Sequence, residues 1–115
     1  MGDTAEYLCK LLGYDKFLPM NSGCEAAETA VKLARRWGYN VKGIPDNEAI
    51  VIVMKGAFWG RSITASGASD DPIRYERFGP FTPGFELVDY NNIPALRKKF
   101  EEKGKNICAV KVEPI

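Results

Sequence analysis

The run Ala49–Met54, "AIVIVM", constrains the fold most, because it is continuously apolar and mostly β-branched. A strand with one solvent-facing side alternates apolar and polar residues. An uninterrupted apolar run is instead typical of a strand buried on both faces, as in a parallel sheet. Parallel neighbours need long crossover connections, which are usually helices. The run therefore predicts an α/β fold, with helices on both faces of a mainly parallel sheet.

Periodicity and capping signals predict the other elements. Helical spacing of apolar residues behind Asp3 predicts a first helix, and a stripe of small residues predicts the longest helix. Asn92 is the expected cap of a later helix. The predicted helices are 3–12, 25–38 and 93–102, with at most a short helix in 56–67. The predicted strands are 16–20, 49–54, 86–90 and 107–112, and the predicted loops are 39–48 and 70–84.

Composition excludes several functional classes. The chain has 115 residues, which is one domain at most, and a net charge of +1, so no basic surface points to nucleic acid or an anionic membrane. No apolar run approaches the ~20 residues that span a bilayer. Three cysteines without a CxxC pair favour reduced thiols in an intracellular compartment. The absence of histidine removes His-based triads and His metal sites, and no other metal site is expected.

The stretch "NSGCEAAE" places Ser22 and Gly23 at the mouth of the longest helix, directly after the expected strand 16–20. A helix start presents free backbone N–H groups and the positive end of the helix dipole, so a phosphate could bind there with Ser22 as a further donor. Neither a GxxxxGK[ST] nor a GxGxxG pattern is present. A plain helix cap remains the alternative.

A second stretch, "GAFWGRS" at 56–62, follows the buried strand. In open α/β sheets ligands bind beyond the carboxyl ends of the strands. Phe58 or Trp59 could cover a flat ring, and Arg61 could clamp a carboxylate with two parallel hydrogen bonds. The alternative is that the aromatic side chains fill the edge of the core while Arg61 forms a surface ion pair.

Two further residues complete the candidates. Glu113 ends the last predicted strand and so belongs to the same rim of the sheet, although a solvated strand end is the alternative. Cys24 lies at a helix N-terminus, but the chain has no histidine to act as its base, so a nucleophilic role is not favoured.

Four segments in order, "FLPMNSGCEAAETAVKLARRWGY", "FWGRS", "FGPFTPGF" and "VEPI", resemble the class III pyridoxal-phosphate-dependent aminotransferases. The likeness covers about residues 3–115. The "NSGxEAxExAxKLAR" pattern is common to the family, whereas "FWGR", "RRWGY" and "FGPFTPGF" favour the members that act on ornithine. The resemblance implies part of the large cofactor-binding domain of a fold-type I aminotransferase.

This resemblance also implies an activity. The complete enzyme would transfer the δ-amino group of L-ornithine to 2-oxoglutarate, giving glutamate semialdehyde and glutamate. An acetylornithine or 4-aminobutyrate aminotransferase, or an inactive phosphate-binding fragment, are the alternatives. The expected substrates are an amino acid and a 2-oxo acid. A homodimer or higher homo-oligomer in the cytoplasm or mitochondrial matrix is expected, with no nucleic-acid or membrane partner.

The resemblance assigns roles to the candidate residues. The turn at Ser22, Gly23 and Cys24 would bind the phosphate of pyridoxal 5'-phosphate. Phe58 would stack on its ring, Trp59 would line the same pocket, and Glu113 would lie near the cofactor. Arg61 would bind a substrate carboxylate. The catalytic lysine of the family falls outside these residues, so we expect residues 1–115 to be the truncated N-terminal part of the large domain, without the small domain and inactive alone.

Overall fold

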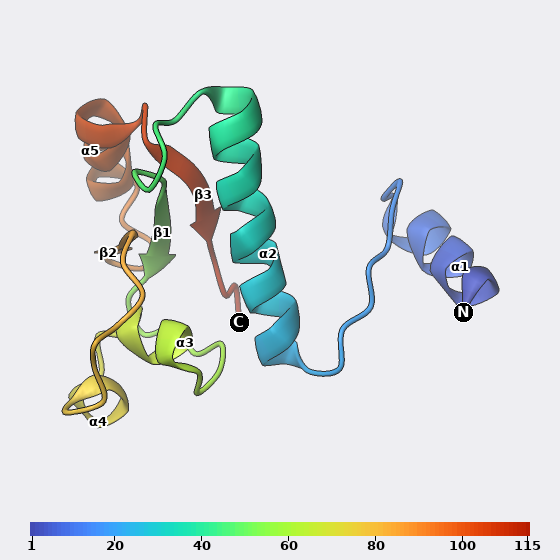
Figure 1. Cartoon of the computed structure of the whole chain (residues 1–115), viewed down its shortest axis with the longest axis horizontal. Helices are drawn as coiled ribbons and strands as arrows, with labels where there is room; N and C mark the ends of the chain where they lie inside the picture. The colour runs from blue at the N-terminus through green and yellow to red at the C-terminus, as the bar shows by residue number, and fades with distance from the viewer.

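The computed structural model describes residues 1–115 and contains a three-stranded sheet with helices on both faces (Figure 1). The strand order is β2 (Phe85–Val88), β1 (Ile50–Met54), β3 (Ile107–Lys111), with both neighbours parallel to β1. The predicted α/β fold with a parallel sheet is therefore confirmed.

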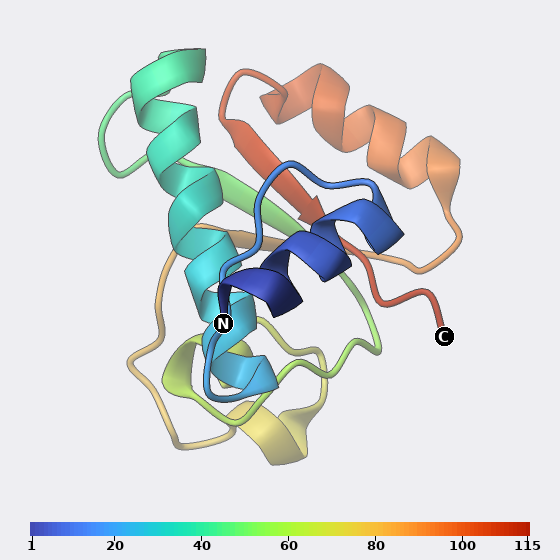
Figure 2. The same ribbon diagram turned by 90° about the vertical axis from the view of Figure 1, so that its right-hand side faces the viewer.

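The central strand β1 is buried on both faces, as its uninterrupted apolar run predicts. Val51 and Val53 are in one core cluster, beneath α2 (Gly23–Trp37). Ile52 and Met54 are in the other, against α5 (Ile93–Lys103). Figure 2 shows the strands between these two helices. The period of two along a strand thus divides the core into two layers.

Small residues let α2 approach the sheet closely. Just beyond the end of α2, a Cβ on Gly38 would lie only 2.9 Å from the Cβ of Cys108 in β3. After Trp37 the helix continues as a wider π-helical turn, η1 (Gly38–Lys42). Lys42 Nζ donates to the carbonyls of Gly104 and Ile107 at 2.6 Å each. These bonds hold the turn against β3, and the prediction of a loop over 39–48 is wrong for residues 39–42 for that reason, whereas residues 43–48 form the expected loop.

Two short helices follow β1. The helix α3 (Ile63–Gly67) confirms the short helix expected within 56–67. The helix α4 (Pro72–Tyr75) interrupts the segment predicted as a loop, because Asp71 caps it and Pro72 occupies its first turn. The predicted cap of α5 is confirmed, since Asn92 Oδ1 accepts from Ala95 N at 3.0 Å.

The N-terminal segment differs most from expectation. The predicted helix is present as α1 (Gly2–Leu12), but it starts before Asp3, which does not cap it. Residues 16–20 form no strand and lie apart from the sheet (Figure 1). No strand of the chain lies beside them, and Pro19 has no N–H to donate to a ladder. None of the helices is both long and apolar enough to span a bilayer.

Candidate active site

The start of α2, the loop after β1 and the segment after β3 meet at one end of the sheet (Figure 1). This is the carboxyl end of the parallel strands, where α/β folds bind ligands. Every residue selected from the sequence lies on one of these three segments. Only Phe58 and Arg61 line the cavity described below, whereas the helix-start residues, Trp59 and Glu113 lie outside its lining.

The loop after β1 is tied to the segment that carries α4. Gly56 N donates to Asp70 Oδ1 at 2.9 Å. Arg74 Nη1 donates to the carbonyl oxygen of Ala57 at 3.0 Å. These two hydrogen bonds fix the loop backbone from one side, immediately before its aromatic pair.

A third bond fixes the same loop from the other side. Phe58 N donates to Glu113 Oε2 at 2.9 Å, so Glu113 is an acceptor for the loop backbone as well as a strand-end carboxylate. The hydroxyl of Tyr90 donates to the carbonyl of Pro114 at 3.3 Å, which steadies the segment behind Glu113. The carboxylate therefore reaches the loop from a position held by β2 and β3.

The Phe58 side chain is 45% exposed and faces a cavity of ≈ 520 Å³. Two guanidinium groups lie over its ring. The Cζ of Arg74 is 5.1 Å from the ring centroid and that of Arg61 is 5.9 Å away, both within the range of cation–π attraction. Phe58, Gly60, Arg61, Ile63, Ile73 and Arg74 are among the residues that line the cavity. The cavity thus combines an aromatic face with positive charge.

Trp59 takes a different position from its neighbour. It is only 8% exposed and belongs to the core cluster with Val51 and Val53. Its ring lies 6.1 Å from that of Phe85, and Lys111 Nζ is 5.3 Å from its centroid. Trp59 fills the core edge, while Phe58 and Arg61 face the cavity.

The start of α2 has the features of a capped helix. Ser22 Oγ accepts from Glu25 N at 3.2 Å and lies 3.1 Å from Glu25 Oε2, to which its hydroxyl donates. The N–H groups of Gly23 and Cys24 precede the first helical hydrogen bond and have no acceptor in the chain. The space beside Gly23 is open. An incoming anion would find two free backbone donors, with the Glu25 carboxylate nearby as an opposing charge.

At Gly60 the loop packs against the start of α2. The φ of Gly60, 141°, is in a region that favours glycine, and a Cβ built there would lie 2.4 Å from Cys24 Sγ. The two segments therefore touch at a point where no larger residue fits. Sequence reasoning selected both segments separately and did not foresee this contact.

Sequence reasoning also missed Asp70 and Arg74. The only signal was local: "SDDPIRY" has an Asp–Pro pair typical of a helix start. The groups that these side chains bind, on Gly56 and Ala57, are determined by the tertiary fold.

Lys55 precedes the loop, and its environment makes it a poor base. Its ammonium group forms an ion pair with Asp89 at 2.7 Å. The hydrogen bond to Asp89 and the charge of that carboxylate raise the pKa of Lys55. The side chain stays protonated at neutral pH, and it contributes charge rather than proton abstraction.

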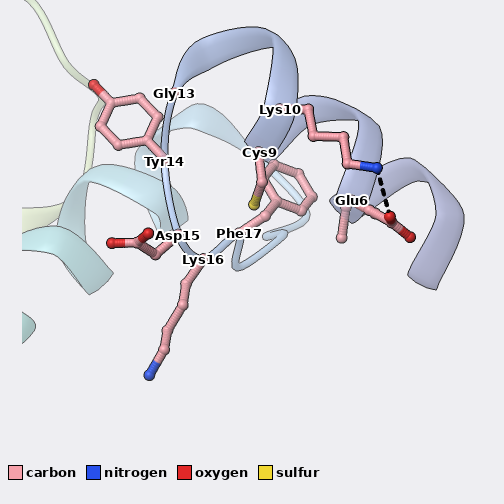
Figure 3. Close-up of a pocket in the computed structure, with 9 residues that line it drawn as sticks. Glu6, Cys9, Lys10, Gly13, Tyr14, Asp15, Lys16 and Phe17 are labelled. Atoms are coloured by element: carbon pink, nitrogen blue, oxygen red, sulfur yellow. Dashed lines mark hydrogen bonds and ion pairs between the residues drawn. The ribbon is translucent and has the colours of Figure 1, made fainter.

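A second hollow lies away from this site, beside α1 and the turn that follows it (Figure 3). Its ion pair, Glu6–Lys10 at 2.7 Å, joins two exposed side chains one helical turn apart, and such pairs contribute little stability. Cys9 and Phe17 lie beside this pair. No group of three or more His, Cys, Asp or Glu residues in the structure could hold a metal ion.

The comparison with protein families is decisive. A family model described as "Aminotransferase class-III" matches residues 1–115. The chain belongs to the class III aminotransferase family. This membership agrees with the resemblance seen in the sequence and with the parallel sheet of the structure.

Curated relatives match the entire chain. The probable mitochondrial ornithine aminotransferase of Caenorhabditis elegans is 56% identical over 115 residues, which are 100% of this chain and 27% of the relative. The mitochondrial ornithine aminotransferase of Rattus norvegicus is 51% identical, over 100% of this chain and 26% of the relative. The chain thus spans about a quarter of the length of these relatives.

Solved structures are similar as well. An ornithine aminotransferase from Toxoplasma gondii superposes with a TM-score of 0.95 at 46% identity, covering 99% of this chain and 26% of that one. That structure has partial occupancy of PLP at its active site. Acetylornithine aminotransferase from Elizabethkingia anophelis has a TM-score of 0.76 at 51% identity, covering 99% of this chain and 27% of that one.

Proposed function

We propose that the full-length protein carrying this chain is a pyridoxal-phosphate-dependent aminotransferase. It transfers the δ-amino group of L-ornithine to 2-oxoglutarate and forms glutamate semialdehyde and glutamate. The observation that carries the proposal is the match to ornithine aminotransferases along the whole chain, at 51–56% identity for the worm and rat proteins. Residues 1–115 are then part of the large cofactor-binding domain, and we expect no transamination from them alone.

The described residues fit this cofactor. Gly23 and Cys24 offer backbone N–H groups without partners at a helix start, with open space beside the glycine. Phosphate binds well at such a position. Phe58 presents a half-exposed aromatic ring next to a cavity of ≈ 520 Å³, which suits a flat heteroaromatic ring. When bound, the cofactor supplies an electron sink for the amino-group transfer.

The chain's own residues have separate tasks in this proposal. The Ser22–Cys24 turn binds the phosphate through the two free N–H groups. Its Ser22 hydroxyl is already engaged by Glu25, so Ser22 contributes by starting the helix. Phe58 packs on the ring, and Glu113 holds the Phe58 backbone beside it. Trp59 anchors the loop from the core side.

Arg61 is proposed to orient the substrate. It is exposed at the cavity, no acidic side chain neutralises it, and a guanidinium group binds carboxylates with two parallel hydrogen bonds. Both ornithine and 2-oxoglutarate have such a carboxylate. A substitution Arg61→Ala in the full-length protein is expected to raise KM for one or both substrates while the cofactor stays bound. Unchanged KM for both would remove Arg61 from the substrate site.

The direct test is a donor competition with the purified full-length protein. Ornithine, acetylornithine and 4-aminobutyrate are supplied with 2-oxoglutarate, and glutamate is followed by mass spectrometry. The proposal requires the highest kcat/KM for ornithine. Preference for acetylornithine would favour the second candidate, which is supported by the 51% identity to the Elizabethkingia anophelis enzyme.

We further propose that the full-length protein is a homodimer or higher homo-oligomer in the mitochondrial matrix. The compartment is supported by the worm relative, a probable mitochondrial ornithine aminotransferase, and by the rat relative, a mitochondrial ornithine aminotransferase. Light scattering of the purified protein tests the assembly, and cell fractionation tests the compartment. Recovery of the protein from the cytosol would overturn the second statement.

A further inference from the structure

Arg74 lines the same cavity as Phe58 and makes three contacts there. Its Nη1 donates to the carbonyl of Ala57 at 3.0 Å, its Nε pairs with Asp71 Oδ2 at 3.2 Å, and its Cζ lies 5.1 Å from the centroid of the Phe58 ring. The first contact holds the backbone next to Phe58, and the third holds the ring itself. One side chain therefore restrains both parts of that aromatic residue.

Asp71 in turn holds Arg74 in place. One carboxylate oxygen accepts from Ile73 N at 3.1 Å, which starts α4, and the other pairs with the guanidinium group. The carboxylate is thus fixed by the helix it caps, and Arg74 is fixed by that carboxylate. Asp70, one residue earlier, binds Gly56 N, so the whole segment braces the aromatic loop.

We propose that Arg74 is a positioning residue that holds the ring of Phe58 at the angle required to pack on the flat ring of the cofactor. This inference rests on the proposed function. Phe58 is 45% exposed, and apart from Arg74 and the more distant Arg61 no ring or cation lies over it. Without Arg74 the ring can turn into the cavity of ≈ 520 Å³.

The guanidinium geometry explains why arginine is needed here. Its planar fork can donate to a carbonyl, pair with a carboxylate and stack on a ring at the same time. A lysine ammonium is a point charge with no plane to stack, so it can keep only part of this arrangement. Arg74→Lys should therefore restore little of what Arg74→Gln loses.

The test uses the full-length protein with the variants Arg74→Gln, Arg74→Lys, Phe58→Leu and the double variant. Arg97→Gln is the matched control, because the Arg97 side chain is exposed on α5 and forms no hydrogen bond or ion pair. Two readouts are measured. Hydrogen exchange of the peptide 55–62 is followed in the cofactor-free protein, and affinity for pyridoxal phosphate is followed by quenching of tryptophan fluorescence.

Arg74→Gln is expected to speed exchange of the 55–62 peptide and to weaken cofactor binding about three- to tenfold, whereas Arg97→Gln changes neither. In the Phe58→Leu background, Arg74→Gln should weaken cofactor binding by less than about a further twofold, because its effect depends on the Phe58 ring. An equal loss in both backgrounds, or exchange like that of the control, overturns the inference. A wild-type protein that binds no pyridoxal phosphate overturns the proposed function, and exchange still decides whether Arg74 holds the loop.

Discussion

The helix start at Ser22–Cys24 and the loop at Gly56–Arg61 lie side by side. The residues that hold the helix start are near it in the sequence, whereas those that hold the loop are far from it. Ser22 is bonded to Glu25, three residues away. The loop is bonded to Asp70, Arg74 and Glu113, which are 14, 17 and 55 residues from their partners. One wall of the site is local in the chain, and the other is assembled from three segments.

This difference indicates on which wall substitutions should weaken cofactor binding more. The donors at the helix start are backbone N–H groups, which no substitution other than proline removes. The loop depends on side chains from α4 and from the segment after β3. We therefore expect substitutions that disturb the loop to affect cofactor binding more than substitutions at the helix start. The four predictions below test this order in the full-length protein, from the largest expected effect on the site to the smallest.

Gly60→Ala should have the largest effect, because it separates the two walls. The new Cβ would lie 2.4 Å from Cys24 Sγ, and φ at this position is 141°. We expect a stability loss of about 1–3 kcal/mol and at least about a tenfold weaker affinity for pyridoxal phosphate. Gly43→Ala is the control, since it also has a positive φ, of 79°, but meets no atom within 4 Å. Urea unfolding and cofactor titration measure both; wild-type affinity in Gly60→Ala would refute the contact.

Glu113→Ala should have the next largest effect. It removes the acceptor of Phe58 N, which lies at 2.9 Å, and a single hydrogen bond of this kind contributes about 0.5–1.5 kcal/mol. Cofactor affinity should fall about two- to tenfold. Glu113→Gln keeps an acceptor oxygen and should lose less. If the two variants weaken binding equally, the charge of Glu113 matters rather than its hydrogen bond to the loop.

Ser22→Ala should reduce stability more than affinity. Loss of an N-cap costs about 1 kcal/mol, whereas the N–H groups of Gly23 and Cys24 remain. Asn92→Ala is the matched control, because it removes the cap of α5, away from the site. Thermal unfolding should show similar losses for both variants, and only Ser22→Ala should weaken cofactor binding, by less than about threefold. A larger loss of affinity would mean that the hydroxyl itself binds the phosphate.

Glu86→Gln should leave the site unchanged and alter only the pH dependence of stability. Lys103 and Lys99 donate to the Glu86 carboxylate and lower its pKa from the ordinary value of 4.5. A carboxylate with a lowered pKa stabilises the fold at pH values above its ordinary pKa. This stabilisation is lost as the pH falls through the lower pKa of the folded state. The variant should have a lower Tm than wild type near neutral pH and the same Tm in acid below that range. Any change in cofactor affinity would show that the α5 face of the sheet is coupled to the site at the carboxyl end of the strands.

The prediction of the fold from sequence succeeded where a pattern repeats over several residues. The apolar run of β1 and the capped, periodic α2 and α5 were predicted within a few residues of their bounds. It failed at residues 16–20, because an apolar pattern becomes a strand only when another strand lies beside it. It also failed at η1, where Lys42 bonds to Gly104 and Ile107.

The candidate site was predicted in part for a similar reason. The selected residues do lie at one end of the sheet, since the carboxyl ends of parallel strands meet there. Their individual orientations could not be read from "AFWGR". Phe58 faces the cavity and Trp59 the core, a choice made by packing against Val51, Val53 and Phe85.

The sequence by itself determined the buried central strand, the cap at Ser22 and the free N–H groups that follow it, because these depend on neighbouring residues. Family membership likewise follows from motifs along the chain. The tertiary structure alone decided that Gly60 touches Cys24 and that Glu113 and Arg74 hold the aromatic loop. Such contacts join residues far apart in the chain. Their partners are set by the relative positions of packed helices and strands, which no local pattern specifies.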